Sequence, residues 1–239
     1  ELDLALEHTA LVSMHAWDCG SPDEYPGWHR AVEYIPRSYA ICREVFPTLL
    51  GAARRAGMVV LHVVAPAPSR YYATYAGYRR AVELAGPEPA APEHITADPT
   101  TAALWRFRAD HVFPGAPNQA DVERGMQHLD FPAEARPQGD EGIAENGHQL
   151  YALCRQAGIS HLIYAGFAIN WCLLLSPGGM ADMQRRGLLC SALREAVTAV
   201  ENKETARDEL GKQLGLWRVS LAFGFVYEVA DLVQALDSL

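Results

Sequence analysis

The sequence predicts a three-layer α/β sandwich built on a mostly parallel sheet of about six strands. Short apolar runs alternate with longer stretches of helical periodicity, and this alternation is typical of βαβ units. The run at residues 58–64 is almost continuously apolar, as expected for a strand that helices cover on both faces. No internal repeat or interdomain linker stands out, so we expect a single domain over residues 1–239.

Apolar runs and glycine stops place the individual elements. Met58 follows a helical pattern that ends at Gly57, and Pro47 inside that pattern predicts a kink or a helix start nearby. Residues 65–148 are rich in Pro, Gly and Ala and show weak periodicity, which is typical of a lid or an interface. The expected strands are 9–14, 58–64, 161–165, 188–193 and 223–226, and the expected helices are 38–56, 71–85, 149–156, 229–236, one after Gly166 and one after Val197.

Composition excludes several classes of protein. The formal net charge is −9 and no basic stripe is visible, which argues against a nucleic-acid partner. No apolar run approaches the roughly 20 residues that cross a bilayer, and the first residues lack the pattern of a signal peptide. The five cysteines are odd in number and form no CxxC pair, so neither a disulfide framework nor a zinc module is expected. These features predict a cytoplasmic protein with no membrane partner.

Candidate site residues follow the predicted strands. Ligands of such sheets bind at the carboxyl ends of the strands. His15, Trp17 and Asp18 follow the first strand, Ala65 follows the second, and residues 166–172 follow the strand at 161–165. We therefore expect Cys172 to lie near His15.

Cys172 is the most informative of these residues. It follows a strand, a glycine and a short turn, and it begins a helix. Backbone N–H groups and the helix dipole at such a position favour a thiolate, and the same groups would stabilise an oxyanion. The alternative is a buried, inert cysteine, which is the commonest kind inside cells.

Five segments resemble the isochorismatase-like cysteine hydrolases, whose fold has a Rossmann-like topology. HLIYAGFAINWCLLL is similar to the family stretch that carries the nucleophilic cysteine, and MADMQRRG to the end of the helix after it. FGFVYEVADLVQAL resembles the family's C-terminus. TALVSMHAWDCG and LLGAARRAGMVVLHVV resemble its opening strand and its second strand with the preceding helix.

The resemblance implies a triad of Asp, Lys and Cys, which this chain matches only at Cys172. His15 stands at the position of the Asp, and Trp17 and Asp18 replace the Gln and Asn that follow it. The Lys has no counterpart because no lysine precedes Lys203. His128, in the stretch 126–131, is the residue we suggest in its place.

The resemblance also implies a cis peptide at Phe167–Ala168, which would direct the N–H groups of Ala168 and Cys172 to one point as an oxyanion hole. In one respect the chain departs from the family, because Ser176-Pro-Gly-Gly179 interrupts the helix after the cysteine.

Some relatives of the nicotinamide-hydrolysing type bind zinc through Asp and His after the second strand. Residues 65–70 offer no such ligand, and His94, His111, His128 and His148 match no zinc spacing, so we expect no metal and no cofactor. The tyrosines at 71, 72, 75 and 78 have helical spacing and are interpreted as packing or a subunit interface.

The leading hypothesis is a cysteine hydrolase that acts on a small-molecule amide or related C–N bond. Cys172 is the nucleophile and His15 its base, oriented by Asp18, while the substrate-binding residues are Trp17, Asp18, Phe167, Asn170 and Trp171. The alternative is an inactive or repurposed member that binds a small ligand or serves assembly, because the family Asp and Lys are missing. The resemblance and the aromatic middle region both suggest a homo-oligomer, a dimer or tetramer.

Overall fold

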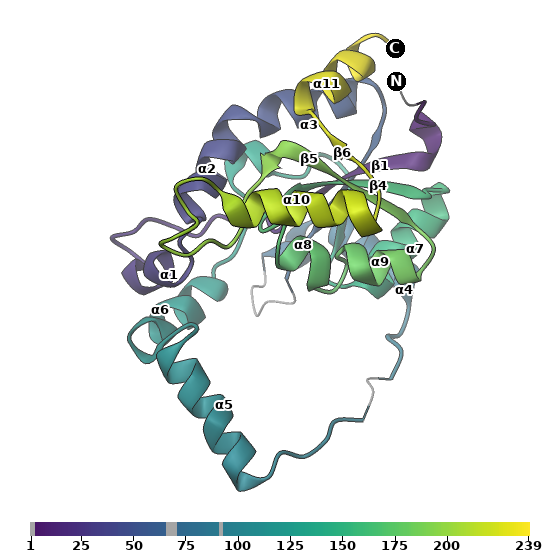
Figure 1. The fold of residues 1–239 in the computed structure, drawn as a ribbon. Helices are drawn as coiled ribbons and strands as arrows, with labels where there is room; N and C mark the ends of the chain where they lie inside the picture. The colour runs from purple at the N-terminus through teal and green to yellow at the C-terminus, as the bar shows by residue number, and fades with distance from the viewer. Residues whose placement is uncertain (1–2, 66–70, 91–92) are drawn as a thin grey trace.

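The chain folds around one six-stranded sheet in which every strand pairing is parallel (Figure 1). The computed structural model describes residues 3–65, 71–90 and 93–239. The strand order is β3-β2-β1-β4-β5-β6, so the first strand lies in the middle. The strands are β1 (Thr9–Met14), β2 (Val59–Val63), β3 (Gly142–Ala144), β4 (His161–Gly166), β5 (Leu189–Val197) and β6 (Val226–Tyr227). This sheet confirms the predicted fold class.

Helices cover both faces of the sheet and complete the three layers. Alternate residues of β1 enter two separate cores, because successive side chains of a strand point to opposite faces. Leu11 packs with α2 (Ile35–Glu44), α3 (Phe46–Arg55) and α11 (Val229–Asp237). Val12 packs on the other face, which is covered by α4 (Ala76–Ala85), α7 (Gly147–Ala157), α8 (Cys172–Leu175), α9 (Met180–Arg185) and α10 (Leu210–Ala222).

Glycine and proline set several helix ends as the sequence predicted. The expected helix at 38–56 is two helices that meet at Val45, and Pro47 lies in the first turn of the second. Gly158 ends α7 in the left-handed conformation, with φ 70°. The helix after β4 is broken between α8 and α9, at the stretch that contains Pro177.

The middle region differs most from its prediction. It contains β3 and two helices that the sequence did not indicate, α5 (Pro99–His111) and α6 (Ala116–Met126). A further short helix, α1 (Pro26–Ala31), packs against α6. Three 3-10 turns complete the elements, at Leu6–His8, Tyr72–Thr74 and Ala133–Ala135.

Three boundaries near the C-terminus also need correction. β5 continues four residues past the expected end at residue 193 and ends at Val197. The helix expected directly after Val197 begins only at Leu210, after an irregular loop. The last strand is Val226–Tyr227 rather than 223–226. Among the described helices, none is long and apolar enough to span a bilayer.

Candidate functional site

His15 occupies the carboxyl end of the central strand β1. Its backbone is left-handed, with φ 54°, and its N–H donates to the carbonyl oxygen of Val63 at 2.8 Å. Its imidazole is buried and stacks on the Trp17 indole, with 4.6 Å between ring centroids. Nδ1 has no hydrogen-bond partner, and burial lowers the pKa of His15 to about 3. The ring is therefore neutral near neutral pH, because a charged imidazolium would be buried without a partner.

A small cavity lies beside His15. Its volume is about 10 Å³, which is room for about one water molecule. Trp17 and Phe167, two of the predicted pocket residues, line it together with His15. The other lining residues come from the stretch that includes α1 and the start of α2, and they are Cys19, Trp28, Val32, Tyr34, Ile35 and Ser38.

The turn after β4 carries Cys172. The peptide between Phe167 and Ala168 is cis, as the resemblance implied. The carbonyl oxygen of Ala168 accepts from the N–H groups of Trp171 at 3.2 Å and Leu173 at 3.1 Å, which closes the turn and begins α8 at Cys172. Neither the Ala168 nor the Cys172 N–H donates to a backbone carbonyl in the described chain. The Cys172 N–H therefore remains free for another acceptor, and the Ala168 N–H is directed at the Cys172 sulfur.

The pKa of the Cys172 thiol is raised rather than lowered, which corrects the prediction of a ready thiolate. Burial is the largest cause, and hydrogen bonds from the Ser176 hydroxyl and the Ala168 N–H to the sulfur oppose it only in part. The helix that was expected to favour the thiolate has only four residues, so few aligned peptide dipoles act on the sulfur. Cys172 is nevertheless partly exposed, whereas the other four cysteines are buried.

No hydrogen bond links the side chains of His15 and Cys172. Neither side chain contributes to the pKa shift of the other. Tyr34 lies near both residues. It lines the cavity beside His15, and the pKa of its phenol is raised strongly, first by burial and then by the Cys172 sulfur. Sequence reasoning missed Tyr34 because no motif distinguishes a tyrosine at the start of a helix.

Asp18 and Asn170 are held by contacts away from the cavity. The Asp18 carboxylate accepts from the Tyr39 hydroxyl at 2.6 Å and from the Gly20 N–H at 3.1 Å, so it does not orient His15. The Asn170 amide exchanges two hydrogen bonds of 2.8 Å with the backbone of Val200. Asn170 therefore fastens the turn that carries Cys172 to the loop after β5.

Trp171 and His128 do not join the predicted pocket. The Trp171 side chain is 57% exposed and does not line the cavity. His128 is exposed in the turn after α6, where its N–H donates to Gly125 at 2.9 Å. The structure thus groups His15, Trp17 and Phe167, places Ala168 against the Cys172 sulfur, and leaves these two residues outside.

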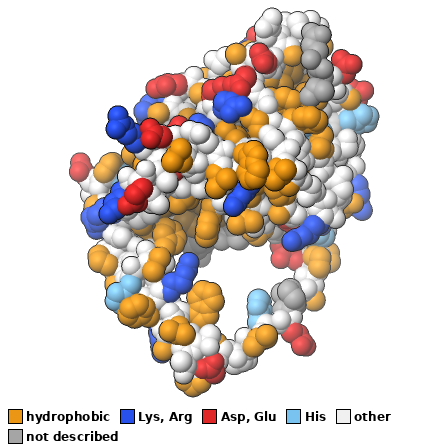
Figure 2. All heavy atoms as spheres, in the orientation of Figure 1, with side chains coloured by type: hydrophobic (Ala, Val, Ile, Leu, Met, Phe, Trp, Pro, Cys, Tyr) orange, Lys and Arg blue, Asp and Glu red, His pale blue; other side chains and the backbone are white. Residues whose placement is uncertain are grey.

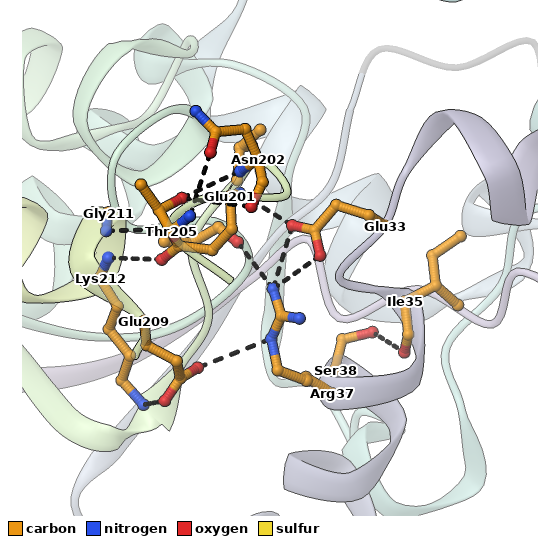
Figure 3. A network of polar contacts seen from close by, with 12 residues as sticks. Glu33, Ile35, Arg37, Ser38, Glu201, Asn202, Thr205, Glu209, Gly211 and Lys212 are labelled. Atoms are coloured by element: carbon orange, nitrogen blue, oxygen red, sulfur yellow. Dashed lines mark hydrogen bonds and ion pairs between the residues drawn. The ribbon is translucent and has the colours of Figure 1, made fainter. Parts of the chain in front are cut away.

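A polar network holds the loop after β5 against the start of α2 (Figure 3). Arg37 pairs with Glu33 at 2.9 Å and donates to the carbonyl oxygen of Ala199 at 3.3 Å. Glu33 accepts from the Glu201 N–H at 2.8 Å. Because Tyr34 lies between Glu33 and Arg37 in sequence, this network fixes the wall of the cavity.

The same network includes Lys212, one of the two lysines of the chain. The Glu201 carboxylate accepts from the N–H groups of Gly211 and Lys212, each at 2.9 Å, at the start of α10. The Lys212 ammonium pairs with Glu209 at 3.7 Å, and Lys203 is exposed and pairs with Glu204 at 3.5 Å. Neither ammonium hydrogen-bonds to Cys172, so neither lysine takes the place of the family's lysine at the sulfur. In the described ranges, no three His, Cys, Asp or Glu side chains are grouped to hold a metal ion.

Comparison with known proteins shows the fold. No family model and no curated protein sequence matches the chain. Among solved structures, a cysteine hydrolase from Pseudomonas syringae pv. phaseolicola 1448A is similar over 100% of this chain and 96% of its own, with TM-score 0.55 and 13% identity. A putative isochorismatase from Burkholderia xenovorans LB400 covers 97% of this chain and 88% of its own, with TM-score 0.52 and 15% identity. The chain therefore has the fold of the isochorismatase-like cysteine hydrolases, in a divergent sequence.

Proposed function

We propose that this chain is a cysteine hydrolase that uses Cys172 to cleave an amide or related C–N bond of a small molecule. The position of Cys172 carries the proposal. Its sulfur lies at the turn after β4, at the carboxyl edge of the sheet, and it is the only one of the five cysteines that is not buried. The N–H of Cys172 donates to no backbone carbonyl in the described chain, and the fold is one in which solved structures are described as cysteine hydrolases.

The reaction proceeds through an acyl-enzyme. The Cys172 sulfur attacks the carbonyl carbon, and the C–O double bond opens to an oxyanion that the N–H groups of Ala168 and Cys172 stabilise. Collapse of this intermediate breaks the C–N bond, and the leaving nitrogen takes a proton from water, which balances the proton that the thiol released to solvent. Water then cleaves the thioester, which releases the carboxylic acid and restores the thiol.

His15 is a poor base for this thiol. Its pKa of about 3 lies far below the thiol's ordinary value of about 8.5, and burial raises the thiol pKa further, so transfer of the proton from the thiol to His15 is unfavourable. We infer that the resting enzyme holds a neutral thiol, and that the reactive thiolate forms by loss of the proton to solvent. Activity should then rise about tenfold per pH unit up to the thiol pKa, with no step near pH 6.5 from His15.

A second function, binding of a small ligand without catalysis, is favoured by the chemistry around the sulfur. The imidazole is a weak base, and neither lysine hydrogen-bonds to Cys172. The cavity of about 10 Å³ is also too small for a substrate unless Trp17 or Tyr34 moves.

One experiment separates the two functions. The wild type, Cys172→Ala and Cys154→Ala are compared on a panel of amides, ureides and vinyl ethers between about pH 7 and 9. Cys154→Ala is the matched control, because it removes a thiol from the same hydrophobic cluster against which Cys172 packs. Turnover that disappears only in Cys172→Ala supports the hydrolase. Turnover that survives in Cys172→Ala rejects it, and binding of panel members without turnover supports the second function.

A further inference from the structure

Helix α5 projects from the body of the molecule with no buried residue. It begins at an Asp98 cap, whose carboxylate accepts from Thr100 at 2.8 Å and Thr101 at 3.2 Å, yet none of its 13 residues is buried. An isolated helix of about this length is marginal in water, and helices in proteins owe most of their stability to packing. Figure 1 shows α5 at the lower edge of the molecule, away from the sheet. Within the described chain the helix therefore packs on little of the molecule, and the element it contacts most is α6, which follows it.

The arm, which we define as residues 93–113, is strongly apolar for a surface segment. Its large apolar side chains spread over more than one side of α5. Trp105 is 62% exposed and Phe107 61% exposed. The other exposed apolar side chains of the arm are Ile95, Leu104, Val112 and Phe113.

Packed elements lie in the chain on either side of the arm. After the arm, α6 is fixed to α1, where the Gly27 N–H donates to Asp121 at 2.7 Å and Trp28 lies so close to Gly125 that a Cβ there would be 2.0 Å away. Before the arm, α4 packs on α7 and β3 and buries Ala81. The arm is thus an internal segment between two packed elements and not a free chain terminus.

Helix α10 presents a second apolar surface, which we call the stripe. Leu210, Leu214, Trp217 and Leu221 are all exposed and recur at the spacing of one helix face. The opposite face of the same helix packs on the sheet through buried residues such as Val219. Figure 2 shows hydrophobic side chains gathered over α10 and along the arm, on the same view of the molecule.

We propose that the arm packs on the stripe of a second copy of this chain, in a reciprocal exchange that covers both surfaces. At roughly 100 Å² per side chain, the ten apolar residues of the arm and stripe present about 1,000 Å² in each copy, against about 800 Å² per partner in a stable complex. Monomeric proteins rarely expose contiguous apolar patches of more than a few hundred Å².

Net charge is compatible with the same partner. The arm carries Glu93, Asp98, Arg106, Arg108 and Asp110, a net charge of −1, whereas α10 carries Lys212 and Arg218 and no acidic residue, a net charge of +2. Two surfaces of opposite net charge attract, and a two-fold arrangement repeats that attraction on both sides.

The first test measures the oligomeric state. Light scattering after gel filtration, at tens of micromolar protein, should show a dimer or larger assembly for the wild type. Two double variants should each weaken association by roughly 100-fold or more, namely Trp105→Ala/Phe107→Ala in the arm and Leu214→Ala/Trp217→Ala in the stripe. Each variant removes one large aromatic contact and a second apolar side chain close to it. Val82→Ala, at an exposed apolar position of α4, is the matched control and should leave assembly unchanged. A monomeric wild type, or assembly that survives the arm variant, overturns the proposal.

The second test asks whether the arm sits on the stripe. Hydrogen exchange should be slow at the amides of α5 in the wild type. In Leu214→Ala/Trp217→Ala it should become at least 100-fold faster there, although the arm itself is unchanged, while the β1 and β4 amides stay protected and report an intact fold. If the arm amides keep their protection in this variant, the stripe is not the surface that binds the arm. None of these substitutions touches Cys172 or the cavity, so failure of this proposal is separate from failure of the hydrolase.

Discussion

Burial of His15 should make the stability of the protein depend on pH in a way that one substitution removes. In the folded chain the imidazole has a pKa of about 3 because it is buried, whereas an exposed histidine has a pKa of about 6.5. The unfolded chain therefore binds a proton between these values that the folded chain cannot bind. His15→Asn removes the titrating group and keeps a residue type that tolerates the left-handed backbone.

The sign and size follow from the two pKa values. The folded-state pKa is lowered, so the contribution of the neutral His15 is complete above about pH 6.5 and is lost as the pH falls toward 3. The loss amounts to about 2 kcal/mol at pH 5 and about 3 kcal/mol at pH 4. The buried His62 and His161 also have lowered pKa values, but they contribute equally to both proteins and cancel in the difference.

The assay is urea unfolding at several pH values from about 8 down to 5, for the wild type and His15→Asn. We expect the wild type to lose about 2 kcal/mol more than the variant across this range. His94→Asn, at an exposed position, is the control and should follow the wild type. Equal pH dependence of the wild type and His15→Asn would show that His15 is not a neutral buried group, and the argument against it as a resting base would fail with it.

Three further predictions concern the groups around the sheet. Glu141→Gln should lower the free energy of unfolding by about 2–3 kcal/mol in urea titrations, because Glu141 pairs with Arg54 at 2.7 Å and His62 at 2.9 Å in a largely buried cluster. An unchanged free energy of unfolding would show that Glu141 does not form these ion pairs. Glu201→Ala should cost about 1–2 kcal/mol in the same assay, because it leaves the first N–H groups of α10 without their carboxylate, and an unchanged midpoint would contradict this. Ser176→Ala should slow alkylation of Cys172 by iodoacetamide about fivefold near neutral pH, since it removes a hydrogen bond that favours the thiolate; an equal or faster rate would refute it.

The sheet could be predicted where strands are buried on both faces. β1, β2 and β4 are mostly apolar and almost entirely buried because helices cover both of their faces. β3 has only three residues, too few for a pattern to appear. Helix α5 left no periodic signal because none of its residues is buried, so no face of it is selected for the core.

The candidate site could be predicted only in part. The position of Cys172 and the cis peptide before Ala168 follow from local segments, which carry their signal in the sequence. The low pKa of His15 does not, because it depends on burial by residues such as Trp28 and Tyr34 from a stretch that showed no regular pattern. The high pKa of Cys172 has the same origin, since burial outweighs the local hydrogen bonds.

Acylation of the protein by an activated ester measures the role of Cys172 most directly. After brief exposure to p-nitrophenyl acetate at about pH 8.5, near the ordinary thiol pKa, intact-mass and peptide analysis should find one acetyl group, on Cys172, which hydrolyses within minutes to restore the free thiol. Cys172→Ala should stay unmodified on the same timescale. An acetyl group that forms first on one of the four buried cysteines, or that stays on Cys172 without hydrolysis, would contradict a hydrolase built on this residue.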